Sequence, residues 1–168
     1  YMSVEVFKDK KHYKDEYKNG GQPITVLENG ELPVVKITNK TGTKITFLPD
    51  DTIFETVIFK PEVIAKRLKE ISYLNKNLKI TFEDNYSEEK KKYEFHETEG
   101  IVGYVKELNK NKDTISDDII YVFGERETCQ VEFAMQNIND FSETIISFCN
   151  NINTVDGGTH VTGAKTAL

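Results

Sequence analysis

The sequence predicts an α+β protein in which an all-β first part is followed by a mixed second part. Short alternations of apolar and polar residues, separated by turn residues, fill the chain up to Pro49. A helical repeat of apolar residues opens the second part, and runs that alternate like strands follow it. Because the pattern changes between Glu55 and Lys60, we expect the boundary between the two parts there.

Four short runs in the first part show the period of two that is typical of a strand. Asn19-Gly20-Gly21 and Glu28-Asn29-Gly30 separate them, and Asn and Gly tolerate the positive φ angles that tight turns need. Pro49 ends the last run, since Pro cannot donate to a sheet. The runs expected to form antiparallel strands are 4–7, 12–17, 34–37 and 43–48.

The second part is expected to begin with one amphipathic helix from Pro61 to Tyr73. Pro is favoured in the first turn of a helix, and the carboxylate of Glu62 suits the positive end of the helix dipole. A polar link should then join two strands into a hairpin. The apolar residues at helical spacing are Ile64, Leu68, Ile71 and Leu74, and the hairpin strands are expected over 78–83 and 92–96.

A second short helix is predicted over 101–108, and more strands follow it. The run Cys129–Gln136 alternates strictly between apolar and polar residues, which indicates a half-buried strand. Other strands are expected over 119–123 and 142–148.

The polar, Gly-rich segment 150–163 is expected to be a loop that precedes a last helix. Thr162 is a good N-cap, so this helix should begin at Gly163. Ala167 and Leu168 resemble the start of an apolar helix face. We therefore expect the chain to be an internal piece of a longer protein.

The composition fits a soluble globular protein, with 38% hydrophobic and 30% charged residues. The formal net charge is -6, so binding of nucleic acid by bulk electrostatics is not expected. No stretch resembles a membrane helix or a signal peptide, and we expect no membrane association and a cytoplasmic location. Cys129 and Cys149 lack the spacing of metal ligands and are expected to be reduced thiols.

Few patterns in the sequence carry chemistry. There is no Gly-rich phosphate loop and no nucleophile elbow, and the three His residues lie far apart. We therefore expect no catalytic residue and no metal ligand. Two segments stand out: 40–50, with its Thr-Gly-Thr, and 147–163, with paired Asn, paired Gly and a Thr-His pair. Polar loops so rich in turn and capping residues are often ordered and functional.

These two segments carry a resemblance to a known family. Asn150-Asn151-Ile152-Asn153-Thr154 and Asp156-Gly157-Gly158-Thr159-His160 closely resemble the signature of the B subunits of DNA gyrase and topoisomerase IV. Thr41-Gly42-Thr43 resembles the strand that closes the ATP site of that family. Residues 65–76 resemble its first transducer helix, and 107–112 also match in order. The similarity covers nearly all of the chain, and several collinear matches are more specific than one short motif.

The resemblance implies a domain organisation. Residues 1–56 resemble the last strands of a GHKL ATPase domain, and residues 57–168 resemble the first two thirds of a transducer domain. In the family, the transducer has a mixed sheet with a left-handed β-α-β crossover. The implied function is to couple ATP binding and hydrolysis, with Mg²⁺, to DNA strand passage and negative supercoiling. The implied partners are the gyrase A subunit and a second B subunit, which joins the first when ATP binds.

Within the ATP site, the resemblance assigns roles to two residues only. Thr43 matches a Thr that meets the adenine side through a water, and Gly42 lets the backbone approach closely. The alternative for Thr43 is a plain strand residue. The family's magnesium-holding Asn, its adenine-reading Asp and its Gly-rich lid are not found, and its γ-phosphate Lys would lie beyond Leu168. We therefore expect the isolated chain to bind neither ATP nor Mg²⁺ tightly and to be inactive.

The chain also departs from the family pattern. Glu97-Thr98-Glu99-Gly100 replaces Tyr-Glu-Gly-Gly, and Ala164 stands where a Phe is common. Val155 stands where some members have a basic residue that faces DNA, so double-stranded DNA is expected to meet other regions of the parent protein. Two alternatives remain open: a topoisomerase IV B subunit rather than gyrase, or an isolated non-catalytic piece that binds a protein partner.

Overall fold

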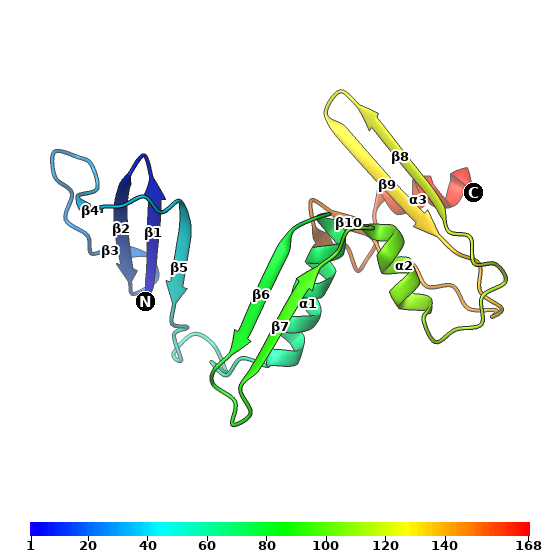
Figure 1. Ribbon diagram of the computed structural model, residues 1–168, viewed down its shortest axis with the longest axis horizontal. Coiled ribbons are helices and arrows are strands. Elements are labelled where there is room, and N and C mark those ends of the chain that lie inside the picture. The colour runs from blue at the N-terminus through cyan, green and yellow to red at the C-terminus, as the bar shows by residue number, and fades with distance from the viewer. The chain divides into compact units, whose positions relative to one another are not determined.

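The computed structural model describes every residue from Tyr1 to Leu168 and divides into two compact units, Tyr1–Phe59 and Lys60–Leu168 (Figure 1). The predicted α+β class is confirmed. The first unit contains only strands: β1 (Met2–Lys8), β2 (Lys11–Lys18), β3 (Gln22–Pro23), β4 (Val34–Ile37) and β5 (Gly42–Phe47). The second unit contains α1 (Pro61–Leu74), β6 (Lys79–Asp84), β7 (Lys91–His96), α2 (Ile101–Asn109), β8 (Ile120–Arg126), β9 (Cys129–Met135), β10 (Phe148–Cys149), β11 (Ile152–Asn153) and α3 (Thr159–Ala167).

The strands of the first unit form one antiparallel sheet in the order β3-β2-β1-β5, and β4 also pairs with β2. Asp9 and Lys10 form the tight turn between β1 and β2, both with positive φ. In the register, Val6 lies between Tyr13 on β2 and Thr43 on β5. The strand β5 therefore lies at an edge of the sheet, next to its central strand β1.

The two faces of this sheet differ in chemistry. Side chains alternate between faces, so Val4, Val6, Ile45 and Phe47 share one face while Ser3, Glu5 and His12 share the other. On the apolar face, Ile45 and Phe47 are 60% and 59% exposed. On the polar face, Ser3 and His12 are only 4% and 6% exposed. The most buried positions of this sheet are therefore polar.

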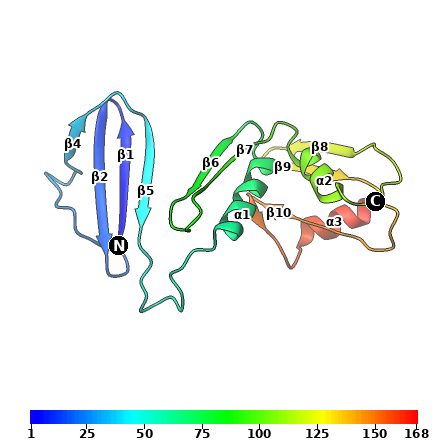
Figure 2. The same cartoon turned by 60° about the horizontal axis from the view of Figure 1, so that its bottom comes forward.

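Helix α1 opens the second unit and lies alongside the β6–β7 hairpin in both views (Figures 1 and 2). Pro61 stands in its first turn with Glu62, as the sequence predicts. The helix buries Ala65, Ser72 and Tyr73. Its end is set by Asn75, whose backbone N–H donates to the Ile71 carbonyl. The predicted helix, 61–73, is confirmed to within one residue.

Helix α2 packs against α1 and against β9. Gly100, directly before it, has a φ of 64°, a conformation that glycine adopts at little cost. A Cβ at this position would displace the flexible side chain of Lys76, so the positive φ is the main reason for glycine here. The ring of Tyr104 on α2 stacks on Tyr73 of α1, with centroids 5.1 Å apart. This aromatic pair joins the two helices.

The mixed sheet predicted for the second unit is not formed. Its strands make three separate antiparallel pairs, β6–β7, β8–β9 and β10–β11, and so the expected left-handed β-α-β crossover is absent. Each pair is joined by a short link, and short links favour antiparallel neighbours. Helix α2 does connect β7 to β8, but these two strands do not pair.

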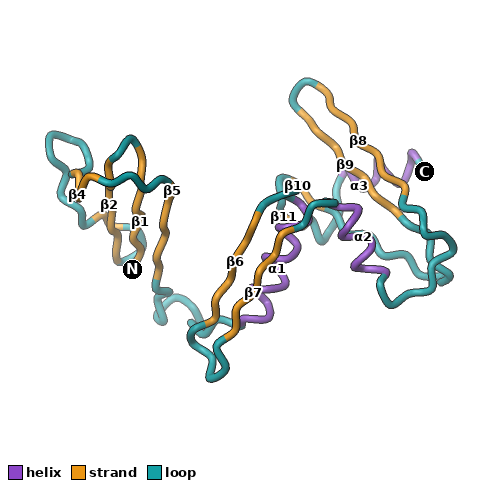
Figure 3. The backbone as a smooth tube through the Cα atoms, viewed as in Figure 1, coloured by secondary structure: helices purple, strands orange, loops and turns teal.

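The strand predicted over 142–148 is also wrong. The segment from β9 to β10 is drawn as loop in Figure 3, and only Phe148 of the predicted run lies in a strand. Asp140 binds the backbone N–H and the hydroxyl of Ser142 at 3.3 and 2.9 Å, which makes a local turn. Ile145 and Ile146 gave the run an apolar character, but a strand also needs a partner strand, and the residues of the run itself do not indicate whether one is present.

The last helix begins earlier than predicted. Helix α3 starts at Thr159, and the carbonyl of Gly158 accepts from the N–H groups of Val161 and Thr162 at 3.0 and 3.1 Å. Thr162 is therefore inside the helix rather than at its N-cap. The predicted loop 150–163 also contains β11 and the first turns of α3. No helix of the structure is long and apolar enough to cross a membrane.

Candidate functional site

Gly42 and Thr43, the two residues predicted to border a nucleotide, stand at the start of the edge strand β5. Gly42 pairs with Phe7 and has a φ of 123°, which favours glycine. No atom lies within 4 Å of the position that a Cβ on Gly42 would take. Thr43 pairs with Val6, and its side chain is exposed. The two residues thus present an open backbone and an exposed hydroxyl at the edge of the sheet.

A polar network on the opposite face ties β5 to the rest of the sheet. The carboxylate of Glu5 on β1 lies 3.0 Å from Nζ of Lys44 on β5 and 2.9 Å from Nε2 of His12 on β2. The hydrogen bond from Lys44 lowers the pKa of Glu5, and His12 acts in the same direction. The His12 ring also stacks on Phe7, with centroids 4.4 Å apart. Three strands are therefore linked through one carboxylate, on the face of the sheet opposite to Thr43.

In the second unit, the Asn pair of the signature segment forms the turn of the β10–β11 hairpin. Asn150 and Asn151 have φ angles of 48° and 66°. A two-residue hairpin turn of this kind needs positive φ at both central positions, and Asn tolerates that conformation better than most residues. Phe148 pairs with Asn153, and Cys149 with Ile152. The motif is thus explained by local backbone geometry.

This turn is attached to helix α1 by two side chains. The Nη2 of Arg67 donates to the carbonyl oxygen of Asn151. The side-chain amide of Asn151 donates to Oδ1 of Asn75 at 3.2 Å. The contacts join residues that are 84 and 76 positions apart in the sequence.

A short chain of side chains continues from the hairpin to helix α3. The hydroxyls of Ser147 and Thr154 lie 2.6 Å apart, and Oγ1 of Thr154 lies 3.1 Å from Nε2 of His160 in the first turn of α3. Gly158 precedes that turn with a φ of 155°, and a Cβ there would lie 2.9 Å from the His160 ring. The Thr-His and Gly-Gly pairs of the signature are therefore used to seat the start of α3.

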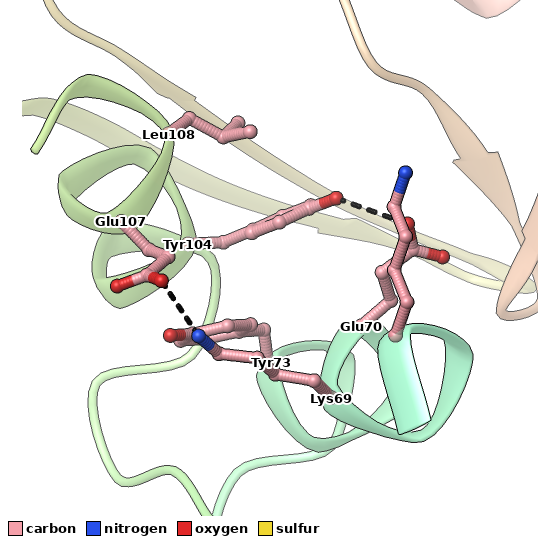
Figure 4. A pocket seen from close by; sticks show the side chains of 7 residues that line it. Lys69, Glu70, Tyr73, Tyr104, Glu107 and Leu108 are labelled. Carbon is pink, nitrogen blue, oxygen red and sulfur yellow. Dashed lines mark hydrogen bonds and ion pairs between the residues drawn. The ribbon is translucent and has the colours of Figure 1, made fainter. Parts of the chain in front are cut away.

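A cavity of about 230 Å³ lies between helices α1 and α2 (Figure 4). Burial, helped by Glu97 and Glu107, raises the pKa of Tyr73 to about 12, and burial with Glu70 does the same for the pKa of Tyr104. Both hydroxyls are therefore protonated near neutral pH, and Tyr104 donates to Glu70 at 3.4 Å. Across the cavity, Lys69 pairs with Glu107 at 2.6 Å. The lining residues are Lys66, Lys69, Glu70, Tyr73, Tyr104, Glu107 and Leu108.

Sequence reasoning found the signature segment but missed the residues that hold it. Arg67 and Glu70 have the i, i+3 spacing of an ion pair within one helix, and this spacing was the only sequence feature that indicated an interaction of Arg67. Asn75 could be recognised only as a residue that ends a helix. No group of three or more His, Cys, Asp or Glu side chains is placed to hold a metal ion.

Comparison with known proteins points to one family. A model of the DNA gyrase B family matches residues 100–168. The chain is 40% identical to the DNA topoisomerase 4 B subunit of Enterococcus faecalis over 168 residues, and 45% identical to the DNA gyrase B subunit of Spiroplasma citri over 172. Both alignments cover 100% of the chain, which spans 24% and 26% of those proteins, about a quarter of their length.

Solved structures agree with the sequence relatives. The crystal structure of the 43K ATPase domain of Thermus thermophilus gyrase B, in complex with an aminocoumarin, is similar with a TM-score of 0.80 and 32% identity. That similarity covers 99% of this chain and 44% of the other. The B subunit of Myxococcus xanthus gyrase has the same fold, with a TM-score of 0.79 at 24% identity over 99% of this chain and 47% of the other.

Proposed function

Because the chain belongs to the family of DNA gyrase and topoisomerase IV B subunits, and corresponds to their ATPase and transducer region, we propose that it works within an ATP-dependent type IIA DNA topoisomerase. In this role it couples ATP binding and hydrolysis to the passage of one DNA duplex through another. The main support is the collinear identity of 40–45% over the whole chain, which includes both the β5 segment and the signature loop.

The two compact units have different roles in this proposal. Residues 1–56 are the last strands of the GHKL ATPase domain, and residues 57–168 are the first two thirds of the transducer. The division between Phe59 and Lys60 supports separate roles, since each unit has its own contacts. The transducer then passes the nucleotide state on to the gyrase A subunit, and ATP joins two B subunits. Double-stranded DNA meets other regions of the protein, which acts in the cytoplasm.

Gly42 and Thr43 form part of the rim of the nucleotide site in this proposal. The open backbone at Gly42 and the exposed hydroxyl of Thr43 support the assignment. Replacing Thr43 by Val keeps the shape of the side chain and removes the hydroxyl. We expect nucleotide affinity of the full-length protein to fall about fivefold, the size of one modest hydrogen bond. Thr46→Val, on the opposite face of β5, is the matched control and leaves affinity unchanged.

The isolated chain is proposed to be inactive and to bind ATP weakly. Stabilising a triphosphate needs cations and directed donors, and Gly42 and Thr43 supply neither a cation nor a metal ligand. Isothermal titration of the isolated chain with a non-hydrolysable ATP analogue should show no tight binding. Tight binding would contradict this assignment and would favour a self-sufficient site.

The direct test of the proposed function uses the full-length polypeptide together with the A subunit of its own enzyme. With relaxed plasmid and ATP, we expect negatively supercoiled DNA, and no supercoiling when ADP replaces ATP. A topoisomerase IV B subunit is the second candidate, favoured by the 40% identity to the Enterococcus faecalis protein. It would relax and unlink DNA with ATP without adding negative supercoils. If the assembled protein neither supercoils DNA nor relaxes and unlinks it with ATP, the proposal is refuted.

A further inference from the structure

Arg67 on helix α1 holds two separate groups with the two ends of its guanidinium. Its Nη1 lies 3.1 Å from Oε2 of Glu70, and its Nη2 donates to the carbonyl of Asn151 in the signature turn. The carboxylate of Glu70 is 15% exposed, so the pair is partly shielded from water. A planar, forked donor can satisfy both acceptors at once, whereas the single ammonium of a Lys cannot do so with the same geometry.

Asn75 at the end of α1 makes a second, independent hydrogen bond to the same turn. Its amide nitrogen donates to the Ile71 carbonyl at 2.8 Å, which fixes the orientation of the amide. Its Oδ1 is therefore presented outward, where it accepts from the side chain of Asn151 at 3.2 Å. One residue of the turn is thus bound through both its backbone and its side chain.

The β10–β11 hairpin that contains the Asn150–Asn151 turn also contacts helices α2 and α3. The ring of Phe148, at the start of the hairpin, lies 6.3 Å from the ring of Tyr104 on α2. At the other end, the hydroxyls of Ser147 and Thr154 lead to His160 on α3. A continuous chain of packed and hydrogen-bonded residues therefore joins α1 to the first turn of α3, and a displacement of α1 can be transmitted along it. Networks of packed and hydrogen-bonded groups are the physical means by which coupling travels.

We propose that Arg67 and Asn75 are positioning residues that clamp the Asn150–Asn151 turn to helix α1 and so transmit movement of α1 to α3. This inference rests on the proposed function, because the transmitted signal is the nucleotide state of the parent enzyme. The clamp is not needed for ATP hydrolysis itself. It is needed for each hydrolysis event to produce strand passage.

The first test replaces Arg67 by Lys in the full-length protein assembled with the A subunit of the enzyme. ATP turnover should stay within about twofold, while supercoiling cycles per ATP hydrolysed should fall about tenfold, a typical size for coupling between distant sites. The matched control is Lys66→Arg, which exchanges the same residue types one position away and leaves the ratio unchanged. An unchanged ratio in Arg67→Lys, or an equal loss of both activities, overturns the proposal.

The second test acts on the other side of the clamp. Asn151→Asp replaces the donor to Asn75 by a carboxylate oxygen, and Asp still tolerates positive φ. Asn150→Asp adds the same charge at the neighbouring position, whose side chain makes no hydrogen bond to α1, unlike that of Asn151. We expect Asn151→Asp to lower cycles per ATP about as much as Arg67→Lys, and Asn150→Asp to leave the ratio unchanged. Equal behaviour of the two Asn variants contradicts the clamp.

Amide hydrogen exchange separates failure of the clamp from failure of the proposed function. In Arg67→Lys and Asn151→Asp, amides of residues 148–160 should exchange faster, while those of the β6–β7 hairpin keep their rates. If the unmodified protein shows no ATP-driven strand passage, the proposed function fails, and the exchange experiment still decides whether the clamp holds. Unchanged exchange in both variants overturns the clamp whatever the enzyme does.

Discussion

The two units of the molecule hold their candidate functional segments by different means. In the first unit, the edge strand β5 is fixed by strand pairing and by the Glu5 carboxylate shared between Lys44 and His12. In the second unit, the signature turn is fixed by the side chains of Arg67 and Asn75, and Phe148 at the start of its hairpin lies 6.3 Å from the half-buried ring of Tyr104. The first arrangement depends on charge, and the second on burial and on directed hydrogen bonds.

This difference bears on which changes each unit tolerates. Large apolar side chains of the first unit remain exposed, as Phe47 does at 59%, whereas Tyr73 in the second unit is 5% exposed. Truncating an aromatic ring costs stability mainly where the ring is buried, because an exposed site leaves no cavity behind. Truncating Tyr73 should therefore be far more costly than truncating Phe47.

The largest effect is expected from Tyr73→Ala. Losing the buried ring and its stack on Tyr104 should lower the free energy of unfolding by about 3–5 kcal/mol. Phe47→Ala is the matched truncation in the first unit, where the ring is 59% exposed and makes an edge contact with Phe59, and it should cost about 1 kcal/mol or less. Urea denaturation of the full-length protein and both variants measures the two values. Similar losses in the two variants would remove the proposed contrast between the units.

The same contrast explains how far the sequence could predict the fold. The strands β1, β2, β4 and β5, the helices α1 and α2 and the two long hairpins follow from local alternation and helical spacing, and they were predicted within a few residues, whereas the two-residue strand β3 was not predicted. The expected strand over 142–148 was wrong because Ile145 and Ile146 have no partner strand, and pairing is not a local property. The mixed sheet was expected from the family resemblance alone, and within these residues the strands of the second unit pair only as antiparallel hairpins.

The candidate site divides in the same way. The Asn150–Asn151 turn and the Gly157–Gly158 pair could be recognised from the sequence, because their residue types reflect local backbone angles. The residues that hold them could not, since Arg67 meets Asn151 across 84 positions and nothing in either neighbourhood encodes the contact. The β5 network was missed for a related reason. His12, Glu5 and Lys44 meet only once three strands are in register.

The next largest effect concerns the start of α3. Gly158→Ala places a Cβ 2.9 Å from the His160 ring at a φ of 155°, so both contact and backbone resist it. We expect a loss of about 1–3 kcal/mol in the free energy of unfolding. Circular dichroism should also show a loss of helix, because His160 lies in the first turn of α3. A variant as stable as the wild type would mean that the Gly-Gly pair is not needed to seat the helix.

Gly163→Ala is the matched change inside α3 and should have the opposite sign. Gly163 has ordinary helical backbone angles, and no atom lies within 4 Å of its Cβ position. Alanine should therefore stabilise the protein by about 0.5–1 kcal/mol through its higher helix propensity. Thermal unfolding at one protein concentration measures the change. Destabilisation would show that α3 meets a neighbour at this position in the full-length protein.

The smallest effect tests the charge-based side of the comparison through pH. The Lys44 hydrogen bond keeps the pKa of Glu5 below its ordinary value of 4.5, and the basic side chains near this carboxylate are those of Lys44, His12 and Lys14, which pairs with Glu5 across the strands. The stability gained from the ionised Glu5 is thus fully present above pH 4.5 and disappears as pH falls through the folded-state pKa. Glu5→Gln should be less stable than the wild type at pH 7, and the gap should close in acid. Glu28→Gln, in an exposed loop, should match the wild type at every pH. Urea denaturation over this pH range decides the point, because a gap that stays constant in acid would mean that Glu5 acts through its shape rather than its charge.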